Sequence, residues 1–309
     1  EKPVESSVVV PDDFDSQAVV DENSYEAMKL EFEKRHAKVI ENSNFVIIKE
    51  DEVIFKSKAD MITSYEHLQY EEFVSAKNKG FVKDSSFIER WRVDPAMRVF
   101  DKVDNYPDAK SCPQNVLNIW TPFRCQTPDY DEMRDDAVEA FKNHILVMCG
   151  NNTTTQSLVL QWLAHMFQYP ISKSFVPVFV AQKGTGKGTF VKWLHKIFGS
   201  KKVLETSRPL DDVFGKFNPL MQHAFIVNLD ECQKKDMIIA NEEYEKMITD
   251  GWININTKGK NAFTMRSYHR FIITTDNDDP VQTDDDDRRN YIIRSSDELK
   301  GNIAYFKKI

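Results

Sequence analysis

Residues 176–198 read VPVFVAQKGTGKGTFVKWLHKIF, and this stretch decides the fold. A short apolar run leads into KGTGKGT, residues 183–189, which we name the glycine loop. An amphipathic run follows and stops at Gly199. The pattern predicts a buried strand, a tight turn and a helix, which is the context in which a phosphate-binding loop is expected.

The glycine loop has the residue types needed to hold a triphosphate. Its glycines let backbone N–H groups turn inward without Cβ clashes, and the following helix directs its positive end at the phosphates. Lys187 is long enough to reach the β- and γ-phosphates. We therefore predict that ATP binds to Gly184, Thr185, Gly186, Lys187, Gly188 and Thr189.

The loop departs from the pattern G-x-x-x-x-G-K-[ST] at two positions. Ala181 stands where the first glycine is expected, and Gly188 stands where a hydroxyl normally holds Mg²⁺. The hydroxyl comes one residue later, at Thr189. A glycine turn with a chance lysine is one alternative. A nucleoside monophosphate kinase is another, because those enzymes also carry GKGT.

A carboxylate pair follows the next apolar run, HAFIVNLDE, residues 223–231. Ligands of a parallel α/β sheet bind beyond the carboxyl ends of its strands, so Asp230 and Glu231 are expected beside the glycine loop. Phosphate hydrolysis needs one carboxylate for the Mg²⁺ shell and one to orient or deprotonate the attacking water. We assign Asp230, with Thr189, to the metal and Glu231 to the water. A simple polar strand end is the alternative.

The third apolar run, HRFIITTD (residues 269–276), ends in a polar cluster. A polar side chain here would hold the attacking water in line with the γ-phosphate. Asp276 and Asn277 are the candidates, and Asn277 is favoured because Asp276 would add negative charge beside the triphosphate. An ordinary polar turn is the alternative.

An arginine doublet, Arg288 and Arg289, precedes the fourth apolar run, RNYIIRS. Arginine stabilises the charge that spreads over the γ-phosphoryl oxygens, in its own subunit or in a neighbour's site. The alternative is a solvated charge run in which the four aspartates at 284–287 screen the arginines.

The chain carries a formal net charge of −8, which argues against broad coating of nucleic acid and requires a local basic patch instead. WININT, KGKN and AFTMRSYHRF (residues 252–271) predict a hairpin with Lys258 and Lys260 at its tip. Lysines there can follow the backbone of single-stranded DNA without reading its sequence. Arg266, His269 and Arg270 would widen the patch. An ordinary solvated turn is the alternative.

Apolar strands that alternate with helices predict an α/β fold with a central parallel sheet in residues 173–309. Residues 1–24 predict an acidic, disordered tail, and residues 25–172 a mainly helical domain that includes two short strands within 44–56. No apolar run is long enough for a membrane span, and the polar N-terminus is no secretory signal. Four unpaired-looking cysteines favour a reducing, intracellular compartment.

Several of these stretches together resemble superfamily 3 helicases, specifically the primase-helicases of the poxvirus and phage type. The matching motor segments are VPVFVAQKGTGKGTF, FIVNLDE, ITDGWININTKGK, FIITTDN and DDDDRRNYII. The upstream segments FIERWRVDPAMRVFDKV, VLNIWTPF and LVLQWLAHMFQYP resemble the helical collar domain that precedes the motor in that family. The resemblance covers roughly residues 36–295.

The resemblance implies an AAA+-like P-loop NTPase that assembles as a hexamer, binds ATP and Mg²⁺ between subunits and moves single-stranded or forked DNA through its channel. It implies that Lys258 and Lys260 line the channel and that Arg288 or Arg289 reaches the next subunit's ATP. A primase, if present, is expected upstream. A viral or phage replicative helicase is the function that follows. An AAA+ ATPase that loads, packages or remodels without unwinding, and a nucleotide-binding ring without turnover, stay open as alternatives.

Overall fold

The computed structural model describes residues 24–50, 52–76, 79–127, 135–282 and 286–308. Two compact units account for them. The smaller comprises the described residues up to Lys34 together with Ile62–Met97, and the larger comprises Arg35–Met61 and the chain from Arg98 onward. The acidic tail predicted for residues 1–24 lies outside the described residues, apart from Ser24.

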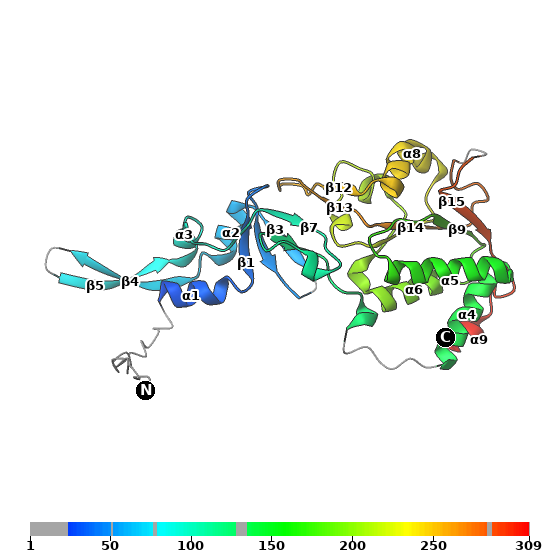
Figure 1. The fold of residues 1–309 in the computed structure, drawn as a ribbon, viewed down its shortest axis with the longest axis horizontal. Helices are drawn as coiled ribbons and strands as arrows, with labels where there is room; N and C mark the ends of the chain where they lie inside the picture. The colour runs from blue at the N-terminus through cyan, green and yellow to red at the C-terminus, as the bar shows by residue number, and fades with distance from the viewer. Residues whose placement is uncertain (1–23, 51, 77–78, 128–134, 283–285, 309) are drawn as a thin grey trace, which may run out of the picture. The chain divides into compact units, whose positions relative to one another are not determined.

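A five-stranded parallel sheet forms the centre of the larger unit (Figure 1). All of its neighbouring strands pair in parallel, in the order β10-β11-β14-β9-β15. Their bounds are β9 Val176–Val180, β10 Val203–Thr206, β11 Ile226–Asp230, β14 Arg270–Thr275 and β15 Asn290–Arg294. The four predicted strands are thus confirmed. The fifth, β10, has only two apolar residues in four and was not predicted from the sequence.

Helices cover both faces of this sheet because its strands are apolar on both sides. One face packs against α4 (Asp135–Met148), α5 (Thr153–Gln168) and α6 (Lys187–Phe198), and the other against α7 (Pro209–Asp212) and α8 (Lys234–Thr249). The alternation is visible in β9, where Phe179 belongs to the first core and Val178 to the second.

Besides the central sheet and its helices, the larger unit holds a second sheet, two strand pairs, further helices and short 3-10 turns. A four-stranded sheet has the order β3-β2-β1-β6, with β1 His36–Val39, β2 Phe45–Ile48, β3 Val53–Lys56 and β6 Val99–Phe100. Two pairs are β7 Lys102–Asp104 with β8 Val116–Asn118, and β12 Trp252–Ile255 with β13 Phe263–Arg266. The helices are α2 Lys58–Tyr65, which ends in the smaller unit, and α9 Ile303–Lys308. Short 3-10 turns are η1 Ala109–Ser111, η2 Arg124–Gln126, η3 Ser200–Lys202 and η4 Pro219–Gln222.

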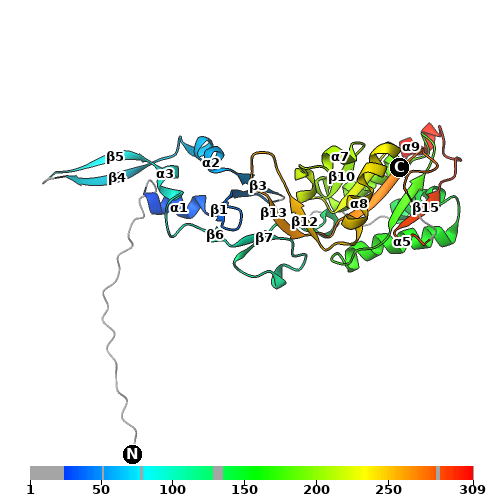
Figure 2. The ribbon, with the colours of Figure 1, turned by 90° about the horizontal axis from the view of Figure 1, so that it is seen from above.

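The smaller unit is built on a two-stranded ribbon, β4 (Gln69–Ala76) and β5 (Lys79–Ser86), which Figure 2 shows in side view. Its short helices are α1 (Tyr25–Phe32) and α3 (Phe87–Trp91). Aromatic rings form its core: Phe32 contacts Phe87 and Trp91 edge-on, at centroid distances of 5.1 and 4.9 Å. Asp94 accepts hydrogen bonds from Lys29 and Tyr25, which lower the pKa of its carboxyl to about 2.

The mainly helical domain predicted for residues 25–172 is wrong in content and in extent. Between His36 and Asn118 the chain forms eight strands, including the ribbon β4–β5 where helical turns were expected. The two short strands predicted within 44–56 are confirmed as β2 and β3. The boundary near residue 172 is also wrong: α4 and α5 pack with α6 on the parallel sheet, so they belong to the same core as its strands.

Three negative observations concern the part of the chain that the structure describes. None of its helices combines the length and the apolar character needed to cross a bilayer. All four cysteines are free thiols. His, Cys, Asp and Glu side chains nowhere gather in groups of three or more that could hold a metal ion.

Candidate active site

A pocket of about 550 Å³ opens at the carboxyl edge of the parallel sheet. This is the edge at which ligands of open α/β sheets bind, and the volume lies in the range of small-ligand pockets. The lining combines the glycine loop, the carboxylate pair and part of the C-terminal helix: Gln182, Lys183, Gly184, Gly186, Lys187, Gly188, Thr189, Lys192, Glu205, Asp230, Glu231, Gly301, Ile303 and Phe306.

The glycine loop adopts the conformation that its sequence predicts. Gly184 and Gly186 have φ values of 82° and 111°, a region that glycine enters without steric cost. Gly186 is the N-cap of α6, so Lys187 is the first helical residue. Thr185 is buried and its hydroxyl donates to the Gln182 carbonyl at 2.7 Å, which closes the turn. The loop therefore presents a helix N-terminus and inward-turned backbone to the pocket.

Lys187 reaches the carboxylate pair across the pocket. Its Nζ lies 2.8 Å from Glu231 Oε1 and donates to the Ala181 carbonyl at 2.5 Å. The side chain is nearly buried, so solvent screens this ion pair only weakly. The two groups that the sequence assigned to one nucleotide are thus in direct contact.

Asp230 and Glu231 end β11, and the neighbouring strand β14 fixes both. Asp230 lies opposite Thr274, whose hydroxyl donates to Asp230 Oδ1 at 2.6 Å. The backbone N–H of Asp276 donates to Glu231 Oε2 at 3.1 Å. Asp230 and Thr189 line the same pocket, and this donor set suits Mg²⁺, which takes one or two protein ligands with phosphate oxygens and water.

Asp276 and Asn277 lie beside the pocket without lining it. Asp276 is the closer of the two, because its carboxylate lies 3.8 Å from Lys183 in the glycine loop and its N–H contacts Glu231. The Asn277 side chain turns away and accepts the backbone N–H of Asp279 at 3.1 Å. The geometry therefore does not favour Asn277, although the charge argument from the sequence did.

The arginine doublet lies at the opposite edge of the sheet from the pocket. It precedes β15, whose first residue pairs with Val176 at the start of β9, whereas the glycine loop follows the end of β9. Arg289 is engaged within its own subunit, at 3.1 Å from Glu245 and 3.8 Å from Asp287. Arg288 is exposed. The position of the doublet therefore excludes contact with the pocket of the same chain, and the exposed Arg288 is also what a solvated charge run predicts.

The predicted basic hairpin is confirmed as β12–β13, with Gly259 at φ 78° in its turn. Lys258 is exposed at the tip, whereas Lys260 is ion-paired with Asp60 at the start of α2. The adjoining segment is also docked, because Asn261 donates to the Asn42 carbonyl at 2.7 Å. The tip is thus held on one side.

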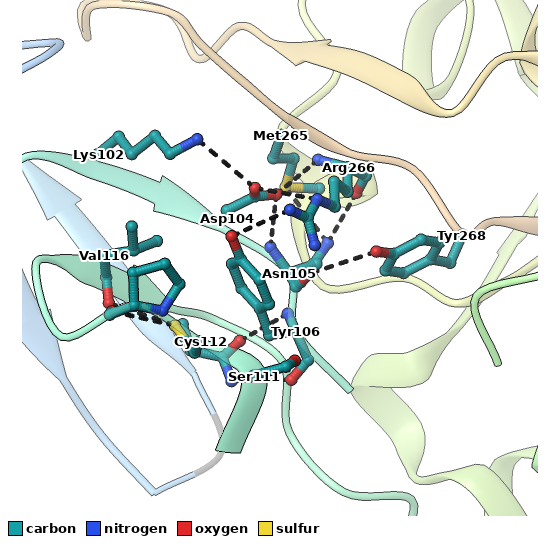
Figure 3. A network of polar contacts seen from close by, with 12 residues as sticks. Lys102, Asp104, Asn105, Tyr106, Ser111, Cys112, Val116, Met265, Arg266 and Tyr268 are labelled. Atoms are coloured by element: carbon teal, nitrogen blue, oxygen red, sulfur yellow. Dashed lines mark hydrogen bonds and ion pairs between the residues drawn. The ribbon is translucent and has the colours of Figure 1, made fainter. Parts of the chain in front are cut away.

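Arg266 belongs to a partly buried network at the base of the hairpin (Figure 3). Its Nε lies 3.4 Å from Asp104 Oδ2, its Nη2 donates to the Tyr106 hydroxyl at 3.0 Å, and its guanidinium stacks on the Tyr106 ring. Asn105 Nδ2 donates to the Arg266 carbonyl at 3.1 Å. Arg266 therefore anchors β13 to β7, and this contact competes with the DNA contact predicted for it.

His269 and Arg270, which were expected to widen the basic patch, are buried instead. His269 contacts the Met221 carbonyl through Nε2 at 2.8 Å. Arg270 donates to the carbonyls of Tyr169 and Ser172. Both belong to the start of β14 and its core, so the prediction that they extend the DNA contact is wrong.

Seven residues that line the pocket were not predicted as site residues from the sequence: Gln182, Lys183, Lys192, Glu205, Gly301, Ile303 and Phe306. Lys192 and Glu205 lie on α6 and on the unpredicted strand β10. Gln182 and Lys183 lie between β9 and α6, and Gly301, Ile303 and Phe306 follow β15. Only a helical periodicity after residue 302, NIAYFKKI, gave a signal, and it was too short to interpret.

Cys232 follows Glu231 directly and is not suited to be a nucleophile. Burial, and after it the carboxylates of Asp230, Asp236 and Glu231, raise the pKa of its thiol to about 12. Because the thiolate is the reactive form, the thiol is inert at neutral pH.

Most of these residues lie in a segment of the chain that is similar to known proteins. A family of unknown function (DUF5906) matches residues 179–289, which contain the glycine loop, the carboxylate pair and the hairpin. The chain is also related to the DNA primase-polymerase of Nitratiruptor phage NrS-1, with 28% identity over 165 residues. That match covers 52% of this chain and 23% of the relative, so the chain spans about a quarter of the relative's length.

Solved structures show the same fold. The apo structure of the NrS-1 C-terminal region, residues 305–718, matches with a TM-score of 0.66 and 22% identity over 90% of this chain and 64% of that one. The A form of this region matches with a TM-score of 0.68 and 22% identity, over 91% of this chain and 65% of that one. At this identity the similarity concerns the fold alone.

Proposed function

We propose that this chain is the ATP-driven motor of a phage DNA replication protein, a P-loop NTPase of the superfamily 3 helicase type. The observation that carries the proposal is the convergence of Lys187 with Asp230 and Glu231 on one pocket. The parallel sheet with a glycine loop after its β9 strand supports the fold class. The relationship to a phage primase-polymerase supports the replication context.

The chemistry follows from the contacts in the pocket. Phosphate oxygens that enter the glycine loop compete with Glu231 for the ammonium group of Lys187. Glu231 stays oriented by the N–H of Asp276 and can then position or deprotonate the attacking water. Mg²⁺ held by Asp230 and Thr189 supplies charge neutralisation on the phosphates.

The assembly we propose is a hexameric ring with single-stranded or forked DNA in its channel, acting inside the host cell. Lys258 contacts the DNA backbone, and Arg288 reaches the ATP of the next subunit because its position excludes its own. Since the relative is a primase-polymerase, we further propose that this motor works with a primase, either upstream in the same chain or in a separate subunit.

ATP hydrolysis by the full chain, measured with and without single-stranded DNA, tests the proposal. We expect DNA to stimulate hydrolysis and AMP not to accept a phosphoryl group. Glu231→Gln should bind ATP as well as the wild type while kcat falls at least about 100-fold, the usual range for a lost general base. Phosphoryl transfer to AMP would establish a kinase. DNA-stimulated turnover without separation of a forked duplex would limit the function to loading, packaging or remodelling.

A further inference from the structure

The C-terminal helix α9 gives the pocket an apolar wall that the phosphate chemistry does not use. Ile303 and Phe306 line the pocket together with the charged groups of the glycine loop. Ile303 is 68% exposed, which is unusual for an isoleucine that also borders a cavity. Phosphates have no need of such a wall, whereas a planar aromatic ligand does.

His144, on α4, joins this wall to the glycine loop. Its imidazole is fully buried, with Nε2 3.0 Å from the Gly186 carbonyl and Nδ1 3.0 Å from the Tyr305 hydroxyl. Because a carbonyl can only accept, Nε2 must carry the proton, and Nδ1 then accepts from Tyr305. Burial lowers the pKa of His144 and keeps the ring neutral, as this pair of bonds requires.

Close packing makes the loop, His144 and α9 one unit. A Cβ added to Gly186 would lie 2.3 Å from His144 Cε1 and 3.2 Å from Phe306 Cε1, so the loop backbone is in contact with both rings. The Tyr305 ring stacks on His144 at 5.9 Å, with 14° between the planes. Lys300, just before α9, donates to the Gln182 side chain beside the loop. These contacts hold α9 against the glycine loop.

We propose that α9 is the nucleobase subsite of this pocket, and that His144 is the positioning residue that holds it against the phosphate-binding loop. Phe306 and Ile303 pack on the base of a nucleoside triphosphate whose phosphates occupy the glycine loop. The inference rests on the proposed nucleotide site and adds the group that distinguishes a nucleotide from a bare polyphosphate. One cavity is lined both by the charged groups of the glycine loop and by the apolar side chains of Ile303 and Phe306.

Binding of two probes to the full chain separates the base from the phosphates. We expect Phe306→Ala to weaken ATP binding about tenfold, the scale of one lost base–aromatic stack, and to leave inorganic tripolyphosphate binding unchanged. Phe306→Tyr should restore ATP affinity. Ile303→Ala should likewise weaken the binding of ATP and not that of tripolyphosphate. Ile239→Ala, at an apolar position of α8 that is 70% exposed, is its matched control and should change the binding of neither ligand. Equal losses for both ligands, or no loss for either, would overturn the subsite.

Binding of the two ligands to the wild type distinguishes failure of the proposed nucleotide site from failure of the nucleobase subsite alone. If it binds neither ATP nor tripolyphosphate, the proposed function falls; if it binds both equally and Phe306→Ala changes nothing, only the subsite falls. Tyr305→Phe removes the hydroxyl bond to His144 and keeps both rings. We expect it to raise KM for ATP about fivefold with kcat unchanged, the scale of one lost hydrogen bond. An unchanged KM, or a fall in kcat alone, would remove His144 from the positioning role.

Discussion

Glu231 combines a strained backbone with a central place in the site. Its φ of 49° lies in the left-handed region, which costs a residue with a side chain about 1–3 kcal/mol. The conformation is held by neighbours, since Glu231 N–H donates to the Thr274 carbonyl at 2.8 Å and the carboxylate contacts Lys187. Strain of this kind is found where surrounding contacts fix a functional side chain, which fits the assignment of Glu231 to the water.

The displaced hydroxyl of the glycine loop gives a test of the metal assignment. We expect Thr189→Ala to raise the Mg²⁺ concentration for half-maximal ATP hydrolysis about tenfold, because Thr189 lines the pocket. A Cβ added to Gly188 would meet no atom within 4 Å, so the loop has room for Gly188→Thr. Added to Thr189→Ala, this second substitution should return the half-maximal Mg²⁺ concentration to the wild-type value. Thr249→Ala, at an exposed position of α8, is the control. A Mg²⁺ titration that Thr189→Ala leaves unmoved would contradict the assignment.

His269 predicts an acid-sensitive part of the fold. Burial first, and then the charges of Lys173, Lys202 and Arg270, lower the pKa of His269 to about 4, from an ordinary value of 6.5. As pH falls below 6.5 the unfolded state takes up the proton before the folded state does, so stability is lost between pH 6.5 and pH 4.

We expect this histidine to contribute a fall of about 2 kcal/mol in the free energy of unfolding between pH 7 and pH 5. Denaturant unfolding of the wild type and of His269→Gln at both pH values measures it. The variant should lose about that much less on acidification, and equal losses in the two proteins would show that His269 is not the sensitive group.

At the scale of elements, the basic hairpin is docked where its sequence suggests a free loop. Phe263 of β13 stacks on Phe55 of β3 at 4.7 Å, and Lys260 pairs with Asp60. A lysine held by a carboxylate must exchange that partner before it can contact a phosphate. The two tip lysines are therefore unequal, and Lys258 is the more available.

Single-stranded DNA binding at several salt concentrations tests this difference. Lys258→Ala should weaken binding and reduce the slope of log affinity against log salt by about 0.7, the value for one lost phosphate contact. Lys260→Ala should have the smaller effect, and Asp60→Asn should strengthen binding by releasing Lys260. Lys196→Ala, at an exposed position of α6, controls for lost charge alone. If the Lys258→Ala, Lys260→Ala double variant binds like the wild type, the hairpin is not the DNA contact.

At the scale of the whole molecule, the proposed catalytic groups lie at two opposite edges of the parallel sheet. The pocket lies at the carboxyl edge, and Arg288 precedes the strand that starts at the amino edge. A ring built from head-to-tail contacts can bring the amino edge of one subunit to the carboxyl edge of the next. One chain is then incomplete as an ATPase.

Mixing inactive subunits tests this completion. Arg288→Ala and Glu231→Gln should each abolish hydrolysis alone, and a 1:1 mixture should recover about a quarter of the wild-type rate if rings assemble at random. Arg289→Ala is the comparison, because Arg289 pairs with Glu245 and Asp287 of its own chain. This variant should be less stable than the wild type, and mixing it with Glu231→Gln should not recover hydrolysis. A mixture that stays inactive while the variants still assemble would exclude Arg288 as the shared residue.

Local features of the sequence predicted the strands that lead to the pocket and half of the residues that line it. The runs that became β9, β11 and β14 are mostly apolar, and each leads into polar or glycine residues, so strand and site could both be predicted. The ribbon β4–β5 was misread, because QYEEFVSA and KGFVKDSS carry charges at helical spacing and pair only with each other.

The sequence by itself determined the glycine loop, its lysine, the carboxylate pair and the strands that lead into them, because all of these depend on neighbours a few residues away. Tertiary structure alone decided the rest. Lys260 pairs with Asp60, which lies 200 residues away in the chain. His144 forms hydrogen bonds with both Gly186 and Tyr305. Such partners are chosen by packing of the whole core, since a buried polar group must find whichever partner the fold brings within reach.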